Sequence, residues 1–354
     1  MTPGTPSTLR LQRNARTRAL GVPACAAMLA AVALGGCGMM RSETSAAAPS
    51  RVQSSSDRPT VTAGDMVAAG RVLRTRGDVE RALRAFERAI EMNPQYTAAY
   101  LAAGDIYREQ GDYSSAERSY GQAAQLEPRN FDAQYSHGLA LQLLSRFGEA
   151  VRAYLRALAI RPDDFQANLN IATAYLQLGE AEQGLPYAQR AVRLSPSSGE
   201  ARVNLGSIYA GLGRHTEAVT ELQQASEMMS LNGSLLLNLA NSLYQLGRFA
   251  EAANTLEEAV RLEPGAIAYE RLGASRYRLG QATEAEAAFR HSLDQDPAHY
   301  PAMNGVAVCL LSRYVLSDQT DETARLEALG MLRNSLRIEP QQPRVIELVR
   351  QFGA

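Results

Sequence analysis

The chain has 354 residues, of which 45% are hydrophobic and 21% charged, and its formal net charge at pH 7 is −1. All of its 36 basic residues are Arg, and 37 acidic residues balance them. Binding to the phosphate backbone of a nucleic acid requires a concentrated basic surface. The composition therefore excludes nucleic acid as an expected partner.

The N-terminal segment has the charge pattern of a signal peptide. It carries four Arg and no acidic residue before an apolar stretch from Ala19 to Leu34, which is shorter than the ~20 residues that a membrane-spanning helix needs. The sequence Leu-Gly-Gly-Cys that ends at Cys37 resembles a bacterial lipobox, whose Cys is acylated before cleavage. This resemblance implies that residues 1–36 are a lipoprotein signal peptide and that lipid chains on Cys37 hold the protein on a membrane. An ordinary secretory signal and an uncleaved anchor are the alternatives.

Residues 37–62 are expected to form a flexible, lipidated tether. Ser, Ala, Pro and Thr dominate the segment, and such a composition cannot bury a core. Loss of residues 1–36 would leave 32 basic and 37 acidic residues and a formal charge of −5. By resemblance to sorted lipoproteins, Gly38 implies a place on the periplasmic face of the outer membrane, because Asp there would favour the inner membrane.

From Ala63 to about residue 340, one pattern recurs every 34 residues. A small residue stands at the eighth place of each unit, where two helices are expected to cross closely. A Gly at the fifteenth place supplies the turn between those helices, and a Pro near the end stops the second helix. The small residues are Gly70, Gly104, Gly138, Ala172, Gly206, Ala240 and Gly273; the turn glycines are Gly77, Gly111, Gly179, Gly213, Gly247 and Gly280; the prolines are Pro94, Pro128, Pro162, Pro196, Pro264, Pro297 and Pro340.

This pattern resembles the tetratricopeptide repeat family, in which Leu-Gly-x-x-Tyr, Ala-x-x-x-Phe and Pro recur over 34 residues. The resemblance implies an all-α fold, a right-handed superhelical solenoid of seven or eight helix-turn-helix units over residues 63–340. Two departures are that no unit carries the family's Trp and that Ser230 replaces the fifth Pro. A generic helical bundle would show no fixed 34-residue phase.

The last unit is irregular, since Pro340 follows Pro297 by more than one period. We expect an insertion, Tyr314 to Thr323, to lengthen its inter-helix turn, either as tolerated surface or as a contact loop. Residues 341–354 are expected to cap the array with a helix from Pro343 to Phe352, whose apolar side faces the preceding helix. The apolar residues are Val345, Ile346, Leu348, Val349 and Phe352, and the expected water-facing residues are Arg344, Glu347, Arg350 and Gln351.

Motifs for catalysis, metal binding or cofactor binding are missing from the sequence. Four His are scattered over different units, and Cys309 in an apolar run is expected to be a buried structural thiol. No Gly-x-Ser-x-Gly elbow, phosphate loop or dinucleotide fingerprint occurs. We expect no cofactor and no enzyme, because the chain ends soon after the array and leaves no room for a catalytic domain.

The inner groove of the array is the candidate binding site. In the family, the second, fifth, sixth, ninth and twelfth places of the first helix point at a bound peptide. An amide column can donate to and accept from an extended peptide backbone, although Asn there also occurs simply as a hydrated residue. The candidate groove residues are Asn170, Asn204, Asn238, Asn241 and Asn304, with Tyr135, Leu169, Tyr244 and Tyr277 beside them. Arg71, Arg74, Asp105 and Arg108 are expected to make the N-terminal end more charged.

Three functions are considered. The first is an envelope-anchored assembly factor that captures an extended partner segment, as in pilotin-type and TadD-like pilus-assembly lipoproteins, which the chain resembles. The second is a general envelope scaffold for cell-wall or outer-membrane assembly enzymes. The third, a repeat module like that of O-linked N-acetylglucosamine transferases, is disfavoured. The expected partners are a protein or extended peptide segment and a membrane contacted through the lipid anchor, and the array is also a candidate for self-association.

Overall fold

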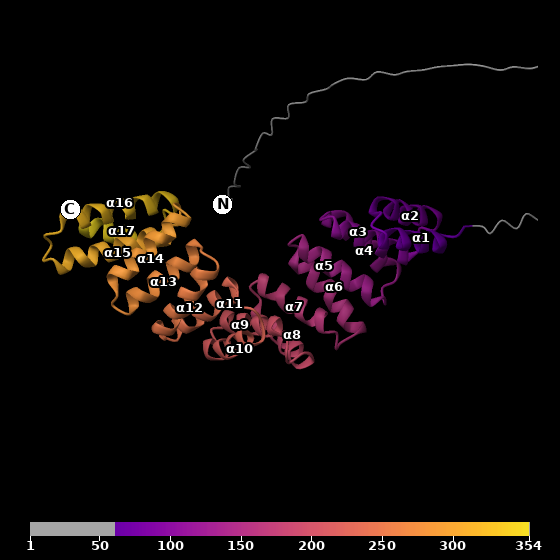
Figure 1. The fold of residues 1–354 in the computed structure, drawn as a ribbon, viewed down its shortest axis with the longest axis horizontal. Helices are drawn as coiled ribbons and strands as arrows, with labels where there is room; N and C mark the ends of the chain where they lie inside the picture. The colour runs from indigo at the N-terminus through magenta and orange to yellow at the C-terminus, as the bar shows by residue number, and fades with distance from the viewer. Residues whose placement is uncertain (1–60, 354) are drawn as a thin grey trace, which may run out of the picture. The chain divides into compact units, whose positions relative to one another are not determined.

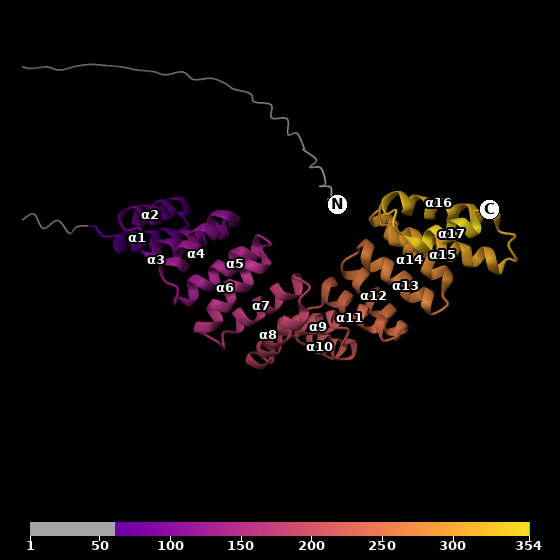
Figure 2. The same cartoon turned by 180° about the vertical axis from the view of Figure 1, so that it is seen from behind.

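The computed structural model describes residues 61–353, which lie within one unit of the chain, residues 59–354. The expected signal peptide, Cys37 and nearly all of the expected tether lie outside the described residues. The described part forms seventeen α-helices and no strand, and Figure 1 and Figure 2 show them in chain order along a row. They are α1 (Ala63–Thr75), α2 (Val79–Met92), α3 (Thr97–Glu109), α4 (Tyr113–Leu126), α5 (Phe131–Leu143), α6 (Phe147–Ile160), α7 (Phe165–Gln177), α8 (Ala181–Leu194), α9 (Gly199–Gly211), α10 (His215–Met228), α11 (Gly233–Gln245), α12 (Phe249–Leu262), α13 (Ala266–Arg278), α14 (Ala282–Gln295), α15 (Tyr300–Leu316), α16 (Glu322–Ile338) and α17 (Pro343–Phe352).

The first sixteen helices form eight hairpins, and each helix packs against the next one in the chain. The first helices of neighbouring hairpins are also in contact, for example α7 with α9 and α13 with α15. Among the described residues, no two second helices pack on each other to a comparable extent. This packing confirms the predicted all-α superhelical solenoid. None of the described helices is both long enough and apolar enough to span a membrane.

In five units, the Gly at the eighth place meets a large side chain of the same hairpin. A Cβ placed on Gly104 would lie 2.7 Å from the ring of Tyr120, and one on Gly206 would lie 2.7 Å from the Leu222 side chain. Real Cβ atoms do not approach other atoms so closely, so the small residue is required by packing. The two helices of a hairpin can approach only because one contributes a large residue and the other leaves room for it.

Left-handed backbone closes the first helix of each regular hairpin. The six turn glycines have φ between 72° and 81°, as predicted from their place in the repeat. The third hairpin has Ser145 at the same place, with φ of 58°. The repeat geometry therefore imposes the left-handed conformation even where the sequence does not offer Gly.

The paired carboxylates between α6 and α7, Asp163 and Asp164, have structural roles. Asp164 caps α7, because its side chain accepts a hydrogen bond from the backbone N–H of Ala167 at 2.8 Å. Asp163 pairs with Arg190 of the next hairpin at 2.7 Å. The two carboxylates serve different partners and do not form an acid/base pair.

The insertion in the last repeat corrects the sequence-based expectation. It was expected to lengthen the turn, but α15 and α16 have 17 residues each, compared with 13 in α13 and 14 in α14. The connection grows only from residues 279–281 to residues 317–321. The extra turn of α15 is helical because Tyr314 is buried and packs edge-on against Phe352 at 6.2 Å between ring centroids.

The terminal helix α17 caps the array as predicted. Val345 is buried, and Leu348, Val349 and Phe352 pack against the core of the last hairpin. The side chains of Arg344, Glu347, Arg350 and Gln351 are exposed. Arg325 of α16 also donates to the carbonyl of Phe352 at 2.6 Å. The helix thus covers apolar surface that a further repeat would otherwise cover.

Candidate functional site

The first helices of the hairpins, α1 to α15 in odd numbers, form a face that we call the inner face. Neighbouring first helices contact each other, whereas neighbouring second helices have no comparable contact within residues 61–353. The row of hairpins is therefore tighter on the side of the first helices and curves toward them. This face is where the sequence placed the candidate groove.

The predicted amide column is present on the inner face, but its N–H groups bind the preceding repeat. Asn170 donates to the hydroxyl of Tyr135 at 3.0 Å, and Asn238 donates to the hydroxyl of Ser207 at 3.1 Å. Both Asn side chains are half-buried. Each amide therefore links two repeats with one donor and keeps its remaining polar capacity for other partners.

Asn204 corrects the expectation that the whole column lies open in the groove. Its residue is only 9% exposed, and its amide donates to the Thr173 hydroxyl at 2.6 Å and to the Leu169 carbonyl at 3.2 Å. Its Oδ1 atom is buried without a hydrogen-bond partner among the described residues. Asn204 is therefore a link between α7 and α9 and part of the core.

Leu169 also lies in the core and not on the groove. It is 2% exposed and packs with Ala191 and Ala201 of the neighbouring helices. The fifth place of that unit therefore points between hairpins. Tyr135, which was predicted beside it, is half-buried and stacks on Phe131 at 5.7 Å.

Two neighbouring cavities open on the inner face near its C-terminal end. The first, of about 280 Å³, lies between α11 and α13, and the second, of about 230 Å³, lies between α13 and α15. Three residues, Tyr244, Glu270 and Ala274, line both cavities. The predicted residue Asn241 lines the first cavity, and the predicted Tyr277 and Asn304 line the second. The structure therefore brings four of the nine predicted groove residues together here.

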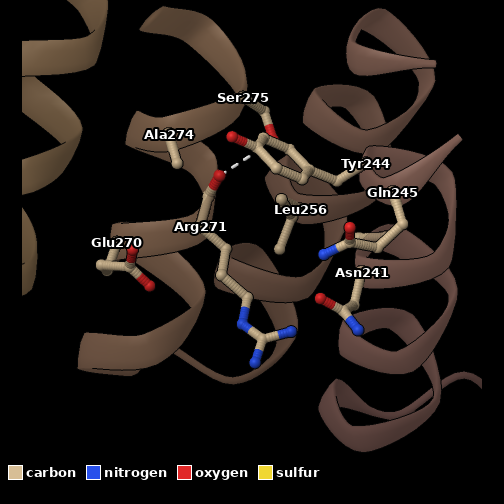
Figure 3. Close-up of a pocket in the computed structure, with 9 residues that line it drawn as sticks. Asn241, Tyr244, Gln245, Leu256, Glu270, Arg271, Ala274 and Ser275 are labelled. Atoms are coloured by element: carbon tan, nitrogen blue, oxygen red, sulfur yellow. Dashed lines mark hydrogen bonds between the residues drawn. The ribbon is translucent and has the colours of Figure 1, made fainter. Parts of the chain in front are cut away.

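The first cavity carries a mixed polar wall, which Figure 3 shows in close-up. Asn241 and Gln245 of α11 face the guanidinium of Arg271 of α13. Within α13, the Ser275 hydroxyl donates to the Arg271 carbonyl at 2.9 Å. The wall thus offers amide donors and acceptors beside one cation, with the apolar Leu256 and Ala274 between them.

Asn304 differs from the other amides because its donor is used by the C-terminal cap. Its amide donates to Oε1 of Gln342, the residue before α17, at 2.7 Å. Its Oδ1 is buried and has no donor within the described part of the chain. Gln342 itself donates to the hydroxyl of Ser335 at 2.9 Å. The last amide of the predicted set is therefore held by the chain itself.

Sequence reasoning missed Glu270 and Arg271. They occupy the fifth and sixth places of the seventh unit, where the three preceding units have an apolar residue and an amide. Neither side chain has a hydrogen bond or ion pair with another residue of the region 61–353. Burial raises the pKa of Glu270, and the charge of Arg271 opposes this only in part. The available signal was this change of residue type, which coincides with a one-residue shortening of the repeat.

Two of the four charged residues predicted at the N-terminal end of the inner face, Arg74 and Asp105, form ion pairs. Arg74 pairs with Asp105 at 3.4 Å and also with Glu109. Asp105 accepts a further hydrogen bond from the Tyr120 hydroxyl at 2.7 Å. Arg74 and Asp105 are therefore occupied within the protein, whereas Arg71 and Arg108 form no ion pair with another of the described residues.

Candidate chemistry elsewhere in the described residues is sparse. Among residues 61–353, no three His, Cys, Asp or Glu side chains gather as a metal site would require. Cys309 is buried, as predicted, and burial raises the pKa of its thiol to about 11. A thiol with such a pKa is a poor nucleophile at neutral pH.

Comparison with known proteins agrees with this architecture. The sequence profile of the family described as Tetratricopeptide repeat matches residues 67–124, 101–165, 169–227 and 237–312. No curated protein matches the whole sequence closely enough to count as a relative.

Solved structures share the fold. The chain resembles one of the APC/C hetero-tetramer Cut9–Hcn1, with a TM-score of 0.56 and 18% identity over 81% of this chain and 55% of that one. It resembles a tetratricopeptide repeat protein from Parabacteroides merdae, with a TM-score of 0.51 and 18% identity over 70% and 98% of the two chains. It also resembles pilF of Pseudomonas aeruginosa, with a TM-score of 0.50 and 20% identity over 60% and 96%. At such identities a likeness establishes the fold alone.

The matched segments cover more than half of the sequence, and the first helices of the eight hairpins begin 33 or 34 residues apart. The chain therefore belongs to the tetratricopeptide repeat family.

Proposed function

We propose that the protein is a membrane-anchored scaffold that captures an extended segment of a partner protein on its inner face during assembly of an envelope machine, such as a secretion or pilus system. The observation that carries the proposal is the pair of cavities shared by α11, α13 and α15. Their walls combine Tyr rings, amides and unpaired charges, which is the mixture that recognises a peptide. The protein performs no reaction in this proposal.

The anchor is the second part of the proposal. It rests on the lipobox-like sequence that ends at Cys37, and the Ser- and Pro-rich residues 37–62 supply a tether. A tether of that length and composition spans roughly 25–30 Å on average. The anchored scaffold therefore samples partners within a layer close to the membrane surface.

Photocrosslinking in the native cell tests the proposal. A photoreactive phenylalanine analogue replaces Gln245, which is exposed at the first cavity, and in a matched variant it replaces Thr220, which is exposed on the second helix α10. Each is made with Cys37 and with Cys37→Ser. We expect secretion or pilus components to crosslink only at position 245 and only with Cys37 intact.

The other outcomes are informative in different ways. Crosslinks at position 245 to cell-wall or outer-membrane assembly enzymes would replace the proposed machine with a general envelope scaffold. Equal crosslinks at positions 245 and 220 would contradict capture on the inner face. Membrane retention of the Cys37→Ser variant would contradict the lipid anchor.

A further inference from the structure

Glu270 stands between the two cavities of the inner face as a carboxylate without a counterion. It is half-buried on α13 and lines both cavities, and within residues 61–353 no donor or cation binds its side chain. Two other half-buried carboxylates, Glu221 and Glu286, are each paired with an Arg. Glu221 accepts from Arg202 at 2.8 Å, and Glu286 accepts from Arg290 at 2.7 Å. A partly desolvated carboxylate that lacks such a partner is costly to the folded protein.

The neighbouring Arg271 does not fill this role. Adjacent residues of a helix do not face each other, because successive side chains point in directions about 100° apart. Figure 3 shows the guanidinium of Arg271 directed toward Asn241, with the carboxylate of Glu270 on the other side of α13. Arg278 also lines the second cavity, but its guanidinium lies over the Phe249 ring at 4.4 Å and 5.9 Å from the centroid of the Tyr244 ring, and it forms no ion pair with Glu270.

The surroundings of Glu270 suit a long side chain that ends in N–H donors. Tyr244 and Tyr277 supply aromatic walls, and Ala274 between them leaves space. Asn304 on the far wall contributes an Oδ1 that lacks a donor in the described region. We call Tyr244, Glu270, Ala274, Tyr277 and Asn304 the Glu270 pocket. This pocket combines a carboxylate that has no ion pair with aromatic faces, and a guanidinium satisfies both because it is planar and carries five N–H donors.

We propose that the Glu270 pocket receives a basic side chain, Arg in preference to Lys, from the partner segment captured on the inner face. The proposal rests on the proposed function and adds a sequence requirement to it. The aliphatic stem lies between the Tyr rings, and the charged end binds Glu270. The peptide backbone on either side is then within the range of Asn241 and Gln245 of the first cavity.

Selection from a random twelve-residue peptide library displayed on phage tests the proposal with the full chain as bait. Three baits are compared: wild type, Glu270→Arg, and the control Glu227→Gln, which alters an exposed carboxylate on α10. We expect peptides selected on wild type and on the control to be enriched in Arg or Lys at one position. The Glu270→Arg bait should instead enrich Asp or Glu there.

A selected peptide then serves as a quantitative probe. Replacement of its basic residue by citrulline, which keeps the shape of Arg without the charge, should weaken binding to wild type about tenfold. The same replacement should change binding to Glu270→Gln by less than about twofold, because the coupling of the two groups is then already lost. Circular dichroism and melting curves establish that each variant is folded.

The failures of the two proposals are distinguishable. If wild type selects peptides that lose binding on Asn241→Ala or Gln245→Ala but show no basic enrichment, the Glu270 pocket is not a basic subsite and capture on the inner face stands. If no selected peptide depends on these inner-face residues, capture itself fails and the basic subsite fails with it.

Discussion

Gly138 of α5 lies directly against the ring of Tyr154 on α6, and a Cβ added to Gly138 would lie 2.7 Å from two ring carbons. Tyr154 is fully buried, so its ring has no room to retreat. We expect Gly138→Ala to destabilise the array by about 1–3 kcal/mol through overpacking. Thermal unfolding followed by circular dichroism measures the effect.

Gly148 provides the matched control for that substitution. It lies in α6 with open space around the position of a Cβ and without a positive φ. Gly148→Ala should therefore stabilise the protein by roughly 0.5–1 kcal/mol, because Ala loses less backbone entropy than Gly in a helix. Equal effects of the two substitutions would show that the contact with Tyr154 is unimportant.

Substitution of Asn204 is expected to lower the stability of the protein, whereas substitution of Asn241 is expected to weaken peptide binding. Asn204→Ala removes both hydrogen bonds between α7 and α9, one to the Thr173 hydroxyl and one to the Leu169 carbonyl. The expected cost is about 1–3 kcal/mol, or a few degrees in Tm for an array of this size. Asn241→Ala should leave Tm nearly unchanged and weaken peptide binding, because Asn241 lines the first cavity. Loss of Tm in Asn241→Ala and not in Asn204→Ala would reverse these assignments.

Ser145 gives a test of the turn geometry. Its φ of 58° is unfavourable for a residue with a Cβ, while the turn glycine Gly179 has φ of 74°. Ser145→Gly should stabilise the third hairpin by up to about 1 kcal/mol, and Gly179→Ala should destabilise the fourth by about 1 kcal/mol. Equilibrium denaturation of both variants supplies the comparison, and effects of the same sign would refute the argument.

The raised pKa of Glu270 leads us to expect that the stability of the protein depends on pH. Burial raises the pKa of Glu270, and the charge of Arg271 acts in the opposite direction. The contribution of this group to the free energy of unfolding is therefore favourable below the unfolded-state pKa near 4.5 and is lost as pH rises through the folded-state pKa. Tyr244, Tyr277 and Arg278 are the other titratable groups around the two cavities. Glu270→Gln should therefore raise Tm at pH 7, and the gain should shrink as pH falls toward 4.5. A gain that is constant with pH would indicate that the carboxylate is solvated in the folded protein.

Much of the fold was predictable because several positions of the repeat each accept only residues of one size or one backbone conformation. The eighth place needs a small residue against a large one, and the fifteenth needs left-handed backbone, so residues such as Gly104 and Gly213 mark the phase directly. The extended helices of the last hairpin were not predictable from spacing alone. An insertion has the same length whether it forms a loop or another turn of helix, and the burial of Tyr314 against Phe352 decides between them.

The groove was predictable only in part, because the position of a residue within the repeat does not determine how deeply its side chain is buried. Asn204 and Asn238 share the sixth place, yet one is buried and the other half-buried. Leu169 and Glu270 share the fifth place, yet only Glu270 lines a cavity. Small changes in hairpin packing move the same register position between core and surface, and these changes depend on side chains many residues away.

The hydrogen bond between Asn304 and Gln342 has a consequence for the length of segment that the inner face accommodates. The amide that would continue the row beyond α13 is occupied by the residue that starts the cap. The row of amide donors that could face a bound peptide therefore ends before α15, and an apolar cavity lined by α15 and α17 lies beyond it. The cap thereby shortens the polar part of the inner face and leaves an apolar stretch at its C-terminal end.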